Sequence, residues 1–231
     1  MENLSLKNKK IFVFDWDGTL FDSMSIKVDN FVEALVKSIN NDAKSIADLP
    51  TRVRILYKKF SGLPRRTIYE NIIKKLGLYI SLFDYNDFNK EFTRLNKIHL
   101  LSADIFNDAD YFLSCLAKKN KIIFISSSVP QEELNYFTNK ILSGCLIKKI
   151  FGILGSELNF SKGADHTKFI LKKTGYLTEE IVFIGDDLFD YNLSRQSCVD
   201  FILINRENHM ISDKNICQIG SLIELEELLN E

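Results

Sequence analysis

The chain of 231 residues is long enough for one domain with a large hydrophobic core, or for such a core with a smaller insertion. Apolar residues make up 45% of it and charged residues 26%, which excludes a disordered or fibrous protein. Thirty basic and thirty-one acidic residues leave a formal charge of −1, so the basic excess typical of proteins that bind nucleic acid or anionic membranes is missing.

The four cysteines, at positions 115, 145, 198 and 217, form no CxxC pair. This spacing argues against a zinc cluster or a disulfide framework and favours a reducing compartment. The N-terminal segment contains lysines at 7, 9 and 10 instead of an apolar signal, and no apolar run reaches the length of a membrane span. We expect a cytoplasmic protein with no membrane anchor, and no obligate protein partner is evident.

Five short apolar runs, rich in β-branched and aromatic residues, are predicted to be parallel strands that are covered on both faces. They are Ile11–Phe14, Ile122–Ile125, Ile150–Leu154, Ile181–Ile184 and Phe201–Ile204. Helical stripes alternate with the later strands, at residues 109–116, 134–141, 169–173 and 222–229. Strand alternating with helix predicts a doubly wound α/β fold.

The alternation stops between about Met24 and Leu101, where we find helical patterns and no convincing strand. Four apolar stripes predict amphipathic helices there: Val28/Phe31/Leu35/Ile39, Val53/Leu56/Phe60, Ile68/Ile72/Leu76 and Phe88/Phe92/Leu95. We expect residues 24–101 to form a helical insertion, and residues 1–23 and 102–231 to form the sheet domain. Open α/β sheets bind ligands beyond the carboxyl ends of their strands, so a bundle of this size after the first strand can cover such a site.

Acidic residues gather where two predicted strands end. Asp15 and Asp17 follow the first strand, and Asp186 and Asp190 follow the fourth strand after Gly185. Carboxylates beside an apolar strand are costly unless something positive, such as a divalent cation, lies between them. A structural turn is the alternative for the first pair.

A hydroxyl and an ammonium group follow the other two strands. Ser126 comes after the second strand, ahead of a helix predicted to begin near Pro130. Hydroxyl and backbone N–H groups at a helix N-terminus suit phosphate oxygens, although an ordinary helix cap is the alternative. Lys162 follows the third strand and precedes a helix predicted to start at about Ala164, so it can project from the same rim of the sheet.

These strand ends match, in order, four motifs of one family. They are DxDGT at Asp15–Thr19, a serine that closes the second strand, a lysine, and GDxxxD at Gly185–Asp190. In these motifs, from about Lys10 to Ile204, the sequence resembles the haloacid dehalogenase superfamily, and in particular its phosphoglycolate phosphatase-like branch. The resemblance implies a Rossmann-like catalytic core and an α-helical cap inserted after the first motif.

The resemblance also implies an activity, that of a Mg²⁺-dependent phosphatase acting on a small phosphorylated metabolite. Asp15 would be the nucleophile that forms an aspartyl-phosphate, and Asp17 would act as acid and base. Mg²⁺ would be held by the Asp15 carboxylate, the Asp17 backbone carbonyl and Asp186.

The remaining motif residues have implied roles in binding phosphate. Ser126 and Lys162 would bind the phosphoryl oxygens, and Asp190 would orient metal-bound water and Lys162. Neighbouring residues compete for these roles: Lys168 with Lys162, Asp187 with Asp186, and Ser127 and Ser128 with Ser126. The motif spacing and the lengths of the predicted elements favour Lys162, Asp186 and Ser126. Ser197-Cys198 stands where relatives commonly carry a small residue and Gly.

Arg65 and Arg66 belong to a predicted turn, Ser61–Arg66, between two helical stripes of the insertion. Similar loops in capped relatives face the active site, so either arginine can recognise an anionic or hydroxyl-rich part of the substrate. Solvated arginines at a helix start are the alternative. The histidines show no pairing pattern, and we expect structural or surface positions for His99, His166 and His209.

Two other functions remain open beside the phosphatase. Phosphosugar mutases keep both aspartates of the first motif, but they tend to carry a bulky apolar residue where this chain has Thr19, and a cap histidine that is not evident here. A regulator that binds a phosphorylated metabolite without catalysis is the other alternative, and an intact catalytic set argues against it. Dehalogenases and phosphonate-cleaving relatives replace the second aspartate, so Asp17 argues against both.

Overall fold

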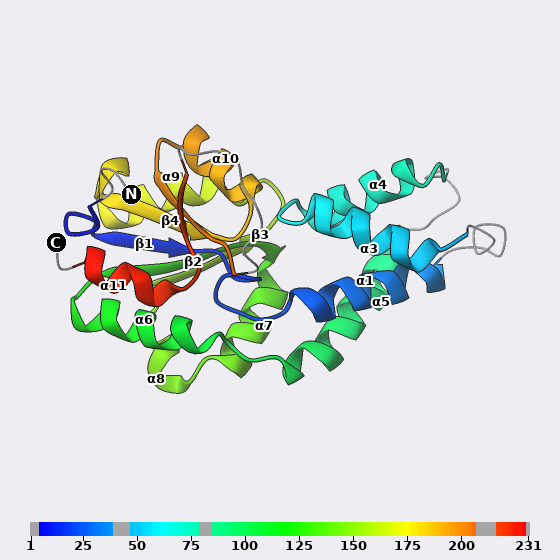
Figure 1. Cartoon of the computed structure of the whole chain (residues 1–231), viewed down its shortest axis with the longest axis horizontal. Coiled ribbons are helices and arrows are strands. Elements are labelled where there is room, and N and C mark those ends of the chain that lie inside the picture. Colours follow the sequence, from blue (N-terminus) through cyan, green and yellow to red (C-terminus); the bar gives the residue numbers. More distant parts are fainter. Residues whose placement is uncertain (1–4, 39–46, 79–84, 207–215, 230–231) are drawn as a thin grey trace. The chain divides into compact units, whose positions relative to one another are not determined.

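The computed structural model describes residues 5–38, 47–78, 85–206 and 216–229 of the chain. It splits into two compact units, Met1–Asp22 with Asp104–Glu231, and Ser23–Ala103. We call them the sheet unit and the helical unit (Figure 1). The chain leaves the sheet unit after Asp22 and returns at Asp104, and the backbone N–H of the first donates to the carbonyl of the second at 3.1 Å.

A parallel sheet, six-stranded in the part of the chain that the structure describes, forms the centre of the sheet unit. Its order is β3-β2-β1-β4-β5-β6, and each neighbouring pair is parallel. The strands are β1 (Ile11–Phe14), β2 (Ile122–Pro130), β3 (Gly152–Ser156), β4 (Ile181–Gly185), β5 (Asp200–Ile204) and β6 (Cys217–Ile219). The predicted doubly wound α/β fold is confirmed, and its order reverses between β1 and β4, where such sheets bind ligands.

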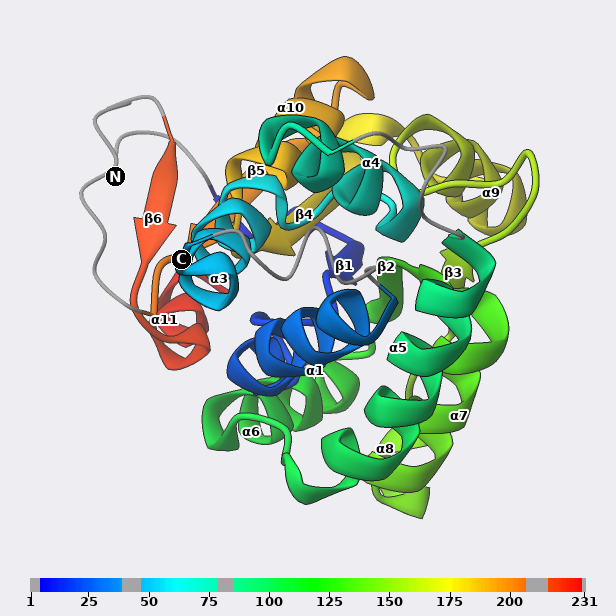
Figure 2. The same ribbon diagram turned by 90° about the vertical axis from the view of Figure 1, so that its right-hand side faces the viewer.

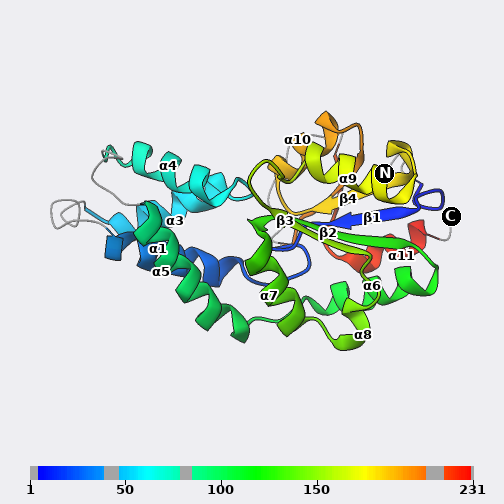
Figure 3. The same ribbon diagram turned by 180° about the vertical axis from the view of Figure 1, so that it is seen from behind.

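Helices cover both faces of this sheet (Figures 1 and 3). One face carries α9 (Ala164–Thr174) and α10 (Leu188–Gln196), and the other carries α6 (Asn107–Lys118), α7 (Gln131–Ile141), α8 (Gly144–Ile147) and α11 (Leu225–Leu228). Short 3₁₀ turns precede β4 at Thr178–Glu180 and α11 at Leu222–Glu224. All four residues of β1 are buried, because helices on both faces exclude water from either side of this central strand.

Two strands differ from their predicted bounds by more than one residue. β2 continues beyond Ile125 to Pro130, because its pairing with β3 resumes after an irregularity in register between Ser126 and Pro130. β3 begins at Gly152 instead of Ile150. The short edge strand β6 was not predicted, since three residues give too little pattern to recognise.

The helical unit contains the four predicted amphipathic helices (Figure 2). They are α1 (Met24–Ser38), α3 (Leu49–Phe60), α4 (Arg65–Lys75) and α5 (Tyr85–His99), and a 3₁₀ turn follows at Leu100–Ser102. Their apolar faces enclose an aromatic cluster, in which the ring of Phe31 lies 4.7 Å from that of Phe88 and 4.9 Å from that of Tyr57, centroid to centroid. Ile39, the last residue of the first stripe, lies outside the described residues.

None of the described helices combines the length and the apolar character that a membrane crossing needs. All four cysteines are unpaired thiols.

Candidate active site

The pairing of the central strands brings the predicted residues to one edge of the sheet. Phe14 of β1 is in register with Ile125 of β2 and with Ile184 of β4. The next residue, Asp15, donates its backbone N–H to the Ile184 carbonyl at 2.9 Å, so the carboxylate is fixed just beyond the last strand pair. Ser126 occupies the equivalent position after Ile125. Gly18, with φ of +81°, then turns the chain away from the sheet.

Asp15 forms a buried ion pair at this edge. Its side chain is 8% exposed, and its Oδ1 lies 2.6 Å from the Nζ of Lys162, which is 4% exposed. The same Nζ lies 2.5 Å from Oδ1 of Asp190, which is 1% exposed. Lys162 therefore bridges two carboxylates that come from distant parts of the chain. Lys168, its competitor from the sequence, is exposed on α9.

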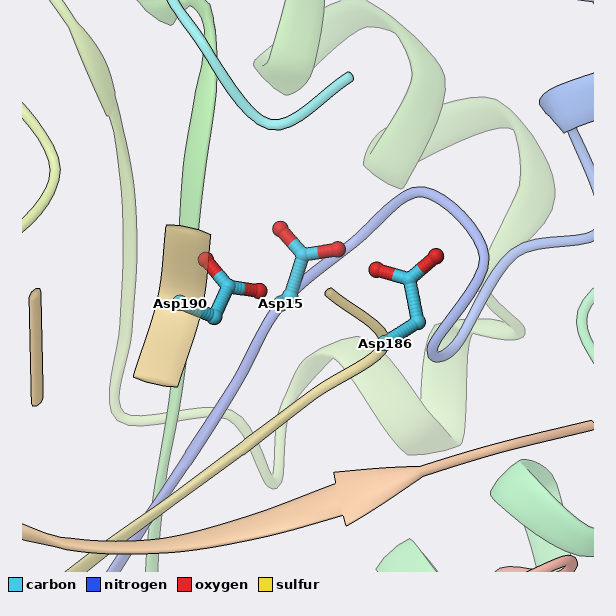
Figure 4. A group of neighbouring side chains, drawn as sticks. All are labelled: Asp15, Asp186 and Asp190. Atoms are coloured by element: carbon cyan, nitrogen blue, oxygen red, sulfur yellow. The ribbon is translucent and has the colours of Figure 1, made fainter. Parts of the chain in front are cut away.

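A third carboxylate completes an acidic cluster. Asp15, Asp186 and Asp190 each place a carboxylate oxygen within 4.8 Å of the others. Figure 4 shows Asp15 between the other two, with the carboxylate of Asp186 turned towards it. Three carboxylates and one ammonium group leave two negative charges in a site from which most water is excluded.

The pKa values of this cluster record the shortage of positive charge. Burial raises the pKa of Asp15 to about 7, and Asp190 and Asp17 add to the rise while Lys162 opposes it. Burial likewise raises the pKa of Asp190 to about 7, against the opposing charge of Lys162. The pKa of Asp186 is raised well above its usual value by burial and by its acidic neighbours. Burial disfavours charge on Lys162, but Asp15 and Asp190 outweigh it and raise its pKa.

The cluster fits a hard divalent cation such as Mg²⁺. Carboxylate oxygens are the ligands that Mg²⁺ prefers, and two positive charges would balance the site. Oδ2 of Asp190 is buried and meets no hydrogen-bond donor among the residues that the structure describes, so it is available to an ion or to its water. Asp15, Asp186 and Asp190 are the side chains that could hold the ion. The Asp17 carbonyl stays a predicted ligand.

Packing at the end of β4 explains the glycine and the spacing of the acids in the GDxxxD segment. A side chain on Gly185 would place its Cβ 2.2 Å from Oδ2 of Asp190, so glycine is required for Asp190 to pack against the end of β4. Asp187 caps α10 by accepting the backbone N–H of Asp190 at 2.9 Å, which leaves Asp186 free to face Asp15. This geometry favours Asp186 over Asp187 as the acid that faces Asp15.

The remaining predicted residues of the sheet unit lie in the same region of the fold. Ser126 is 1% exposed. Ser127 is also buried, and its hydroxyl accepts the Val129 backbone N–H at 3.2 Å, a local contact that stabilises the end of β2. Asp17 is half-buried in the loop after β1, close enough to raise the pKa of Asp15.

His166 is a site-adjacent residue that the sequence reasoning missed. It is buried in the first turn of α9, and its Nδ1 lies 2.8 Å from the Ser126 Oγ. The two residues are 40 positions apart in the sequence, so no local pattern signals this contact.

Arg206 was also missed, and it supports the loop of the first motif. Its guanidinium donates to the Thr19 carbonyl at 2.8 Å and forms two hydrogen bonds with Asp108, at 2.9 and 3.0 Å. Asp108 also accepts from Ser221 and from the Leu222 backbone N–H, which ties the C-terminal segment to the same loop. No local sequence pattern marks a pair separated by 98 residues.

Arg65 and Arg66 lie in the first turn of α4, so the predicted turn ends at Pro64, and including the arginines in it was wrong. Arg65 donates to Asn89 at 3.0 Å and to Thr93 at 2.8 Å, which are groups of α5. Arg66 is 71% exposed and pairs with Glu70 on its own helix. His99, the histidine of this unit, is exposed, and His209 lies outside the described residues.

The fold and the cluster define a class, the doubly wound α/β proteins with an acidic cluster at the carboxyl edge of the sheet. A comparison with protein-family models matches residues 12–204 to the haloacid dehalogenase-like hydrolases. The chain therefore belongs to the haloacid dehalogenase-like hydrolase family, and the resemblance carried by its motifs is confirmed. A comparison with curated proteins gives no match.

Solved structures share the whole fold at low sequence identity. A haloacid dehalogenase-like hydrolase from Bacteroides fragilis has 18% identity and a TM-score of 0.76, with 94% of this chain and 99% of that one covered. A protein from Haemophilus somnus 129PT, described as a predicted phosphoglycolate phosphatase, has 15% identity and a TM-score of 0.76, with 96% and 98% covered. The hydrolase YfnB of Bacillus subtilis, solved with magnesium bound, has 18% identity and a TM-score of 0.67, with 96% and 99% covered.

Proposed function

We propose that the protein is a Mg²⁺-dependent phosphatase that hydrolyses a small phosphate monoester through an aspartyl-phosphate on Asp15. The observation that carries this proposal is the buried carboxylate of Asp15 beside one lysine and two further acids, in a chain of a hydrolase family. The magnesium in the Bacillus subtilis relative and the description of the Haemophilus relative support it. Four unpaired thiols suit a cytoplasmic enzyme.

In the first step, an oxygen of the Asp15 carboxylate attacks phosphorus and the bond from phosphorus to the ester oxygen breaks. Asp17 donates a proton to that leaving oxygen, so the alcohol departs neutral. The product bound to the enzyme is an acyl phosphate on Asp15. Lys162, 2.6 Å from the attacking carboxylate, is placed to neutralise charge on the phosphoryl oxygens.

In the second step, a water molecule attacks phosphorus, and Asp17 takes a proton from that water as the water oxygen bonds to phosphorus. The bond between phosphorus and Asp15 then breaks, and inorganic phosphate leaves with the carboxylate restored. When bound at Asp15, Asp186 and Asp190, Mg²⁺ would supply positive charge that keeps Asp15 ionised and offsets its repulsion of the phosphate dianion. Ser126 would bind another phosphoryl oxygen.

We also propose that the helical unit is the cap of this enzyme and that the sheet unit is its catalytic core, as the family resemblance implies. Arg65 or Arg66 would then recognise the part of the substrate beyond the phosphate. Arg66 is the more available of the two for a substrate group, because its guanidinium is exposed, whereas that of Arg65 already donates to Asn89 and Thr93. Comparing kcat/KM for the natural substrate and for p-nitrophenyl phosphate in Arg65→Ala and Arg66→Ala tests this role.

The function is tested by measuring phosphate release from small acid phosphates, sugar phosphates and nucleotides, with Mg²⁺ or with EDTA. We expect release from at least one class, dependent on Mg²⁺, and none with Asp15→Asn, because an amide is not a nucleophile. Asp110→Asn is the matched control, since it makes the same change at an exposed position on α6 and should leave the rate unchanged.

Mass spectrometry of acid-quenched protein should find one phosphoryl group on Asp15. Wild-type turnover by the pure Asp15→Asn protein, or turnover in EDTA, would overturn the mechanism. Isomerisation of a sugar phosphate without phosphate release would instead identify a mutase.

A further inference from the structure

The loop that carries Asp17 is a turn closed by backbone hydrogen bonds. The Trp16 carbonyl accepts the N–H groups of Leu20 and Phe21, at 3.1 and 2.9 Å. The N–H of Gly18 donates to the Phe21 carbonyl at 2.8 Å. Asp17 lies inside this turn and is half-buried. The position of its carboxylate therefore depends on where the turn as a whole is held at the end of β1.

Arg206, two residues after β5, holds the turn through the carbonyl of Thr19. Its Nη2 donates to that carbonyl at 2.8 Å, across 187 positions of the sequence. Because Thr19 is fully buried, the loss of this donor is costly unless the turn moves. The hydrogen bond thus links the place of the turn to the place of the guanidinium.

The guanidinium of Arg206 is itself held firmly. It donates to both carboxylate oxygens of Asp108, at 2.9 and 3.0 Å, and its Cζ lies 3.7 Å from the centroid of the Phe106 ring. Asp108 also accepts from the Ser221 hydroxyl at 2.8 Å and from the Leu222 N–H at 2.9 Å. The guanidinium is therefore anchored to the start of α6, which the C-terminal segment holds in turn.

A second hydrogen bond joins the same two parts of the chain. The backbone N–H of Phe106 donates to the carbonyl of Leu20 at 2.9 Å. Arg206 and Phe106 thus hold the adjacent carbonyls of Thr19 and Leu20, and they also contact each other. A lysine would keep the charge of Arg206 but not the planar fork, which donates to the Thr19 and Asp108 oxygens at once.

We infer that Arg206 is a positioning residue for Asp17, which anchors the turn through the Thr19 carbonyl and so fixes the carboxylate where a leaving oxygen can take its proton. The inference rests on the proposed function, in which Asp17 is the acid and base. A general acid must lie within hydrogen-bond reach of the atom that it protonates. Asp15 is fixed separately, by its N–H bond to Ile184 of β4. Loss of the anchor should therefore impair proton transfer more than nucleophilic attack.

Two esters of similar size distinguish this role from a general loss of structure. Phenol is a weaker acid than p-nitrophenol, so the leaving oxygen of phenyl phosphate needs the proton more. The value of kcat/KM reports the steps up to release of the phenol, and so excludes the later attack of water. We expect Arg206→Met to lower kcat/KM by about 10- to 100-fold for phenyl phosphate and by less than about 3-fold for p-nitrophenyl phosphate. Arg206→Lys, which keeps a donor for the carbonyl, should recover part of the loss.

Two controls separate the anchor from the network around it. Ser221→Ala removes one hydrogen bond to Asp108 and leaves the contacts of the guanidinium, so kcat/KM should be unchanged for both esters. In the Asp17→Asn background, Arg206→Met should cause no further loss with phenyl phosphate, because Arg206 acts through Asp17. Equal losses on the two esters, or a loss that adds to that of Asp17→Asn, would overturn the inference, since a merely structural role predicts them.

Hydrogen exchange provides a measurement that needs no turnover. Arg206→Met should speed the exchange of the Leu20 and Phe21 amides, which close the turn, and Ser221→Ala should leave them protected. Unchanged exchange in Arg206→Met would overturn the inference even in an active enzyme. If exchange responds as expected but the wild type releases phosphate from no ester, the proposed function is overturned instead.

Discussion

Acidic side chains in the two units are in opposite electrostatic situations. In the helical unit, the pKa of Glu91 is lowered to about 2 by hydrogen bonds from Arg94 and Lys37, so one carboxylate has two cations. At the sheet edge, the pKa values of Asp15 and Asp190 are raised to about 7, because burial and repulsion by neighbouring acids exceed the opposing effect of Lys162. Surface pairs such as the first contribute little to stability and nothing to chemistry. Buried charge left uncompensated is typical of a functional site.

The largest effect expected from a change at the sheet edge, outside Asp15 itself, is at Asp17. Asp17→Asn should slow phosphate release by about 10²- to 10⁴-fold, because it removes the acid and base of both steps. The loss should be greater with alkyl phosphates, whose leaving group needs the proton, than with p-nitrophenyl phosphate. The control is Glu91→Gln, whose rate with p-nitrophenyl phosphate should match the wild type. An unchanged alkyl phosphate rate in Asp17→Asn would reject the assignment.

The next effect concerns the stability of the protein at low pH. The folded pKa of His166, about 4, lies below its unfolded value of 6.5, mainly because of burial; the hydrogen bond to the Gly155 carbonyl opposes the drop, and Lys162 adds to it. Its contribution is therefore complete above pH 6.5 and is lost as the pH falls towards 4. The size of the shift corresponds to about 3 kcal/mol.

Chemical denaturation of the wild type and of His166→Gln between pH 4 and 7 measures this contribution. The difference between the two proteins should shrink or reverse as the pH falls. Asp15 and Asp190 have raised pKa values, so they contribute more to stability at low pH. This contribution is the same in both proteins and therefore cancels in the difference between them. A difference that does not change with pH would contradict the neutral, buried ring.

Metal binding should also stabilise the sheet unit. Mg²⁺ at 100 times its Kd should add about 2.7 kcal/mol to the free energy of unfolding, by mass action. Asp186→Asn should abolish the increase, because it removes a carboxylate of the cluster, and Glu91→Gln should leave it intact. Thermal unfolding with Mg²⁺ and with EDTA measures this. A Tm increase that survives in Asp186→Asn would place the ion elsewhere.

Within the helical unit, the two neighbouring arginines should differ. Arg65→Ala should destabilise the protein by about 1–2 kcal/mol, because it removes hydrogen bonds to Asn89 and Thr93 and the contact of the guanidinium with the Phe92 ring. Arg66→Ala should cost less, about 0.5 kcal/mol, since its guanidinium is exposed and contacts only the exposed Glu70 carboxylate and the Tyr85 ring among the groups described. Equal losses of stability in urea denaturation would contradict this distinction.

The smallest effect is expected after α10. Cys198 has φ of +53°, a left-handed conformation that is unfavourable for a side chain with Cβ. Cys198→Gly should stabilise the protein by about 0.5–1 kcal/mol. Cys145→Gly provides the matched control, because Cys145 lies inside helix α8, where glycine should be destabilising. A Tm that falls for both variants would show that the side chain of Cys198 outweighs the backbone strain.

The features that the sequence predicted are those that depend on local pattern. Apolar runs located β1, β4 and β5 to within one residue, and the order of the motifs placed Asp15, Lys162 and Asp186 at the carboxyl edge. In each case the signal lies within a few residues of the feature.

The features that were missed depend on contacts between distant segments. The hydrogen bond from Ser126 to His166 needs α9 to pack on β2, and the bond from Arg206 to Asp108 joins residues 98 positions apart. The start of α4 at Arg65 was misread because the proline that precedes a helix also favours a turn. Tertiary packing determines these details, and a single sequence does not encode it in any short window.

The position of β1 at the centre of the sheet has a consequence for synthesis on the ribosome. Ile11 pairs with Ile122 on one side and with Ile181 on the other, so the first strand to be made is among the last to gain both neighbours. At roughly 5–20 residues per second, the second partner is made about 10–30 s after the first strand. The helical unit, which is formed by the continuous segment Ser23–Ala103, can fold during that interval. Nascent chains that end before β4 should therefore expose one edge of the apolar strand β1, which chaperones can bind.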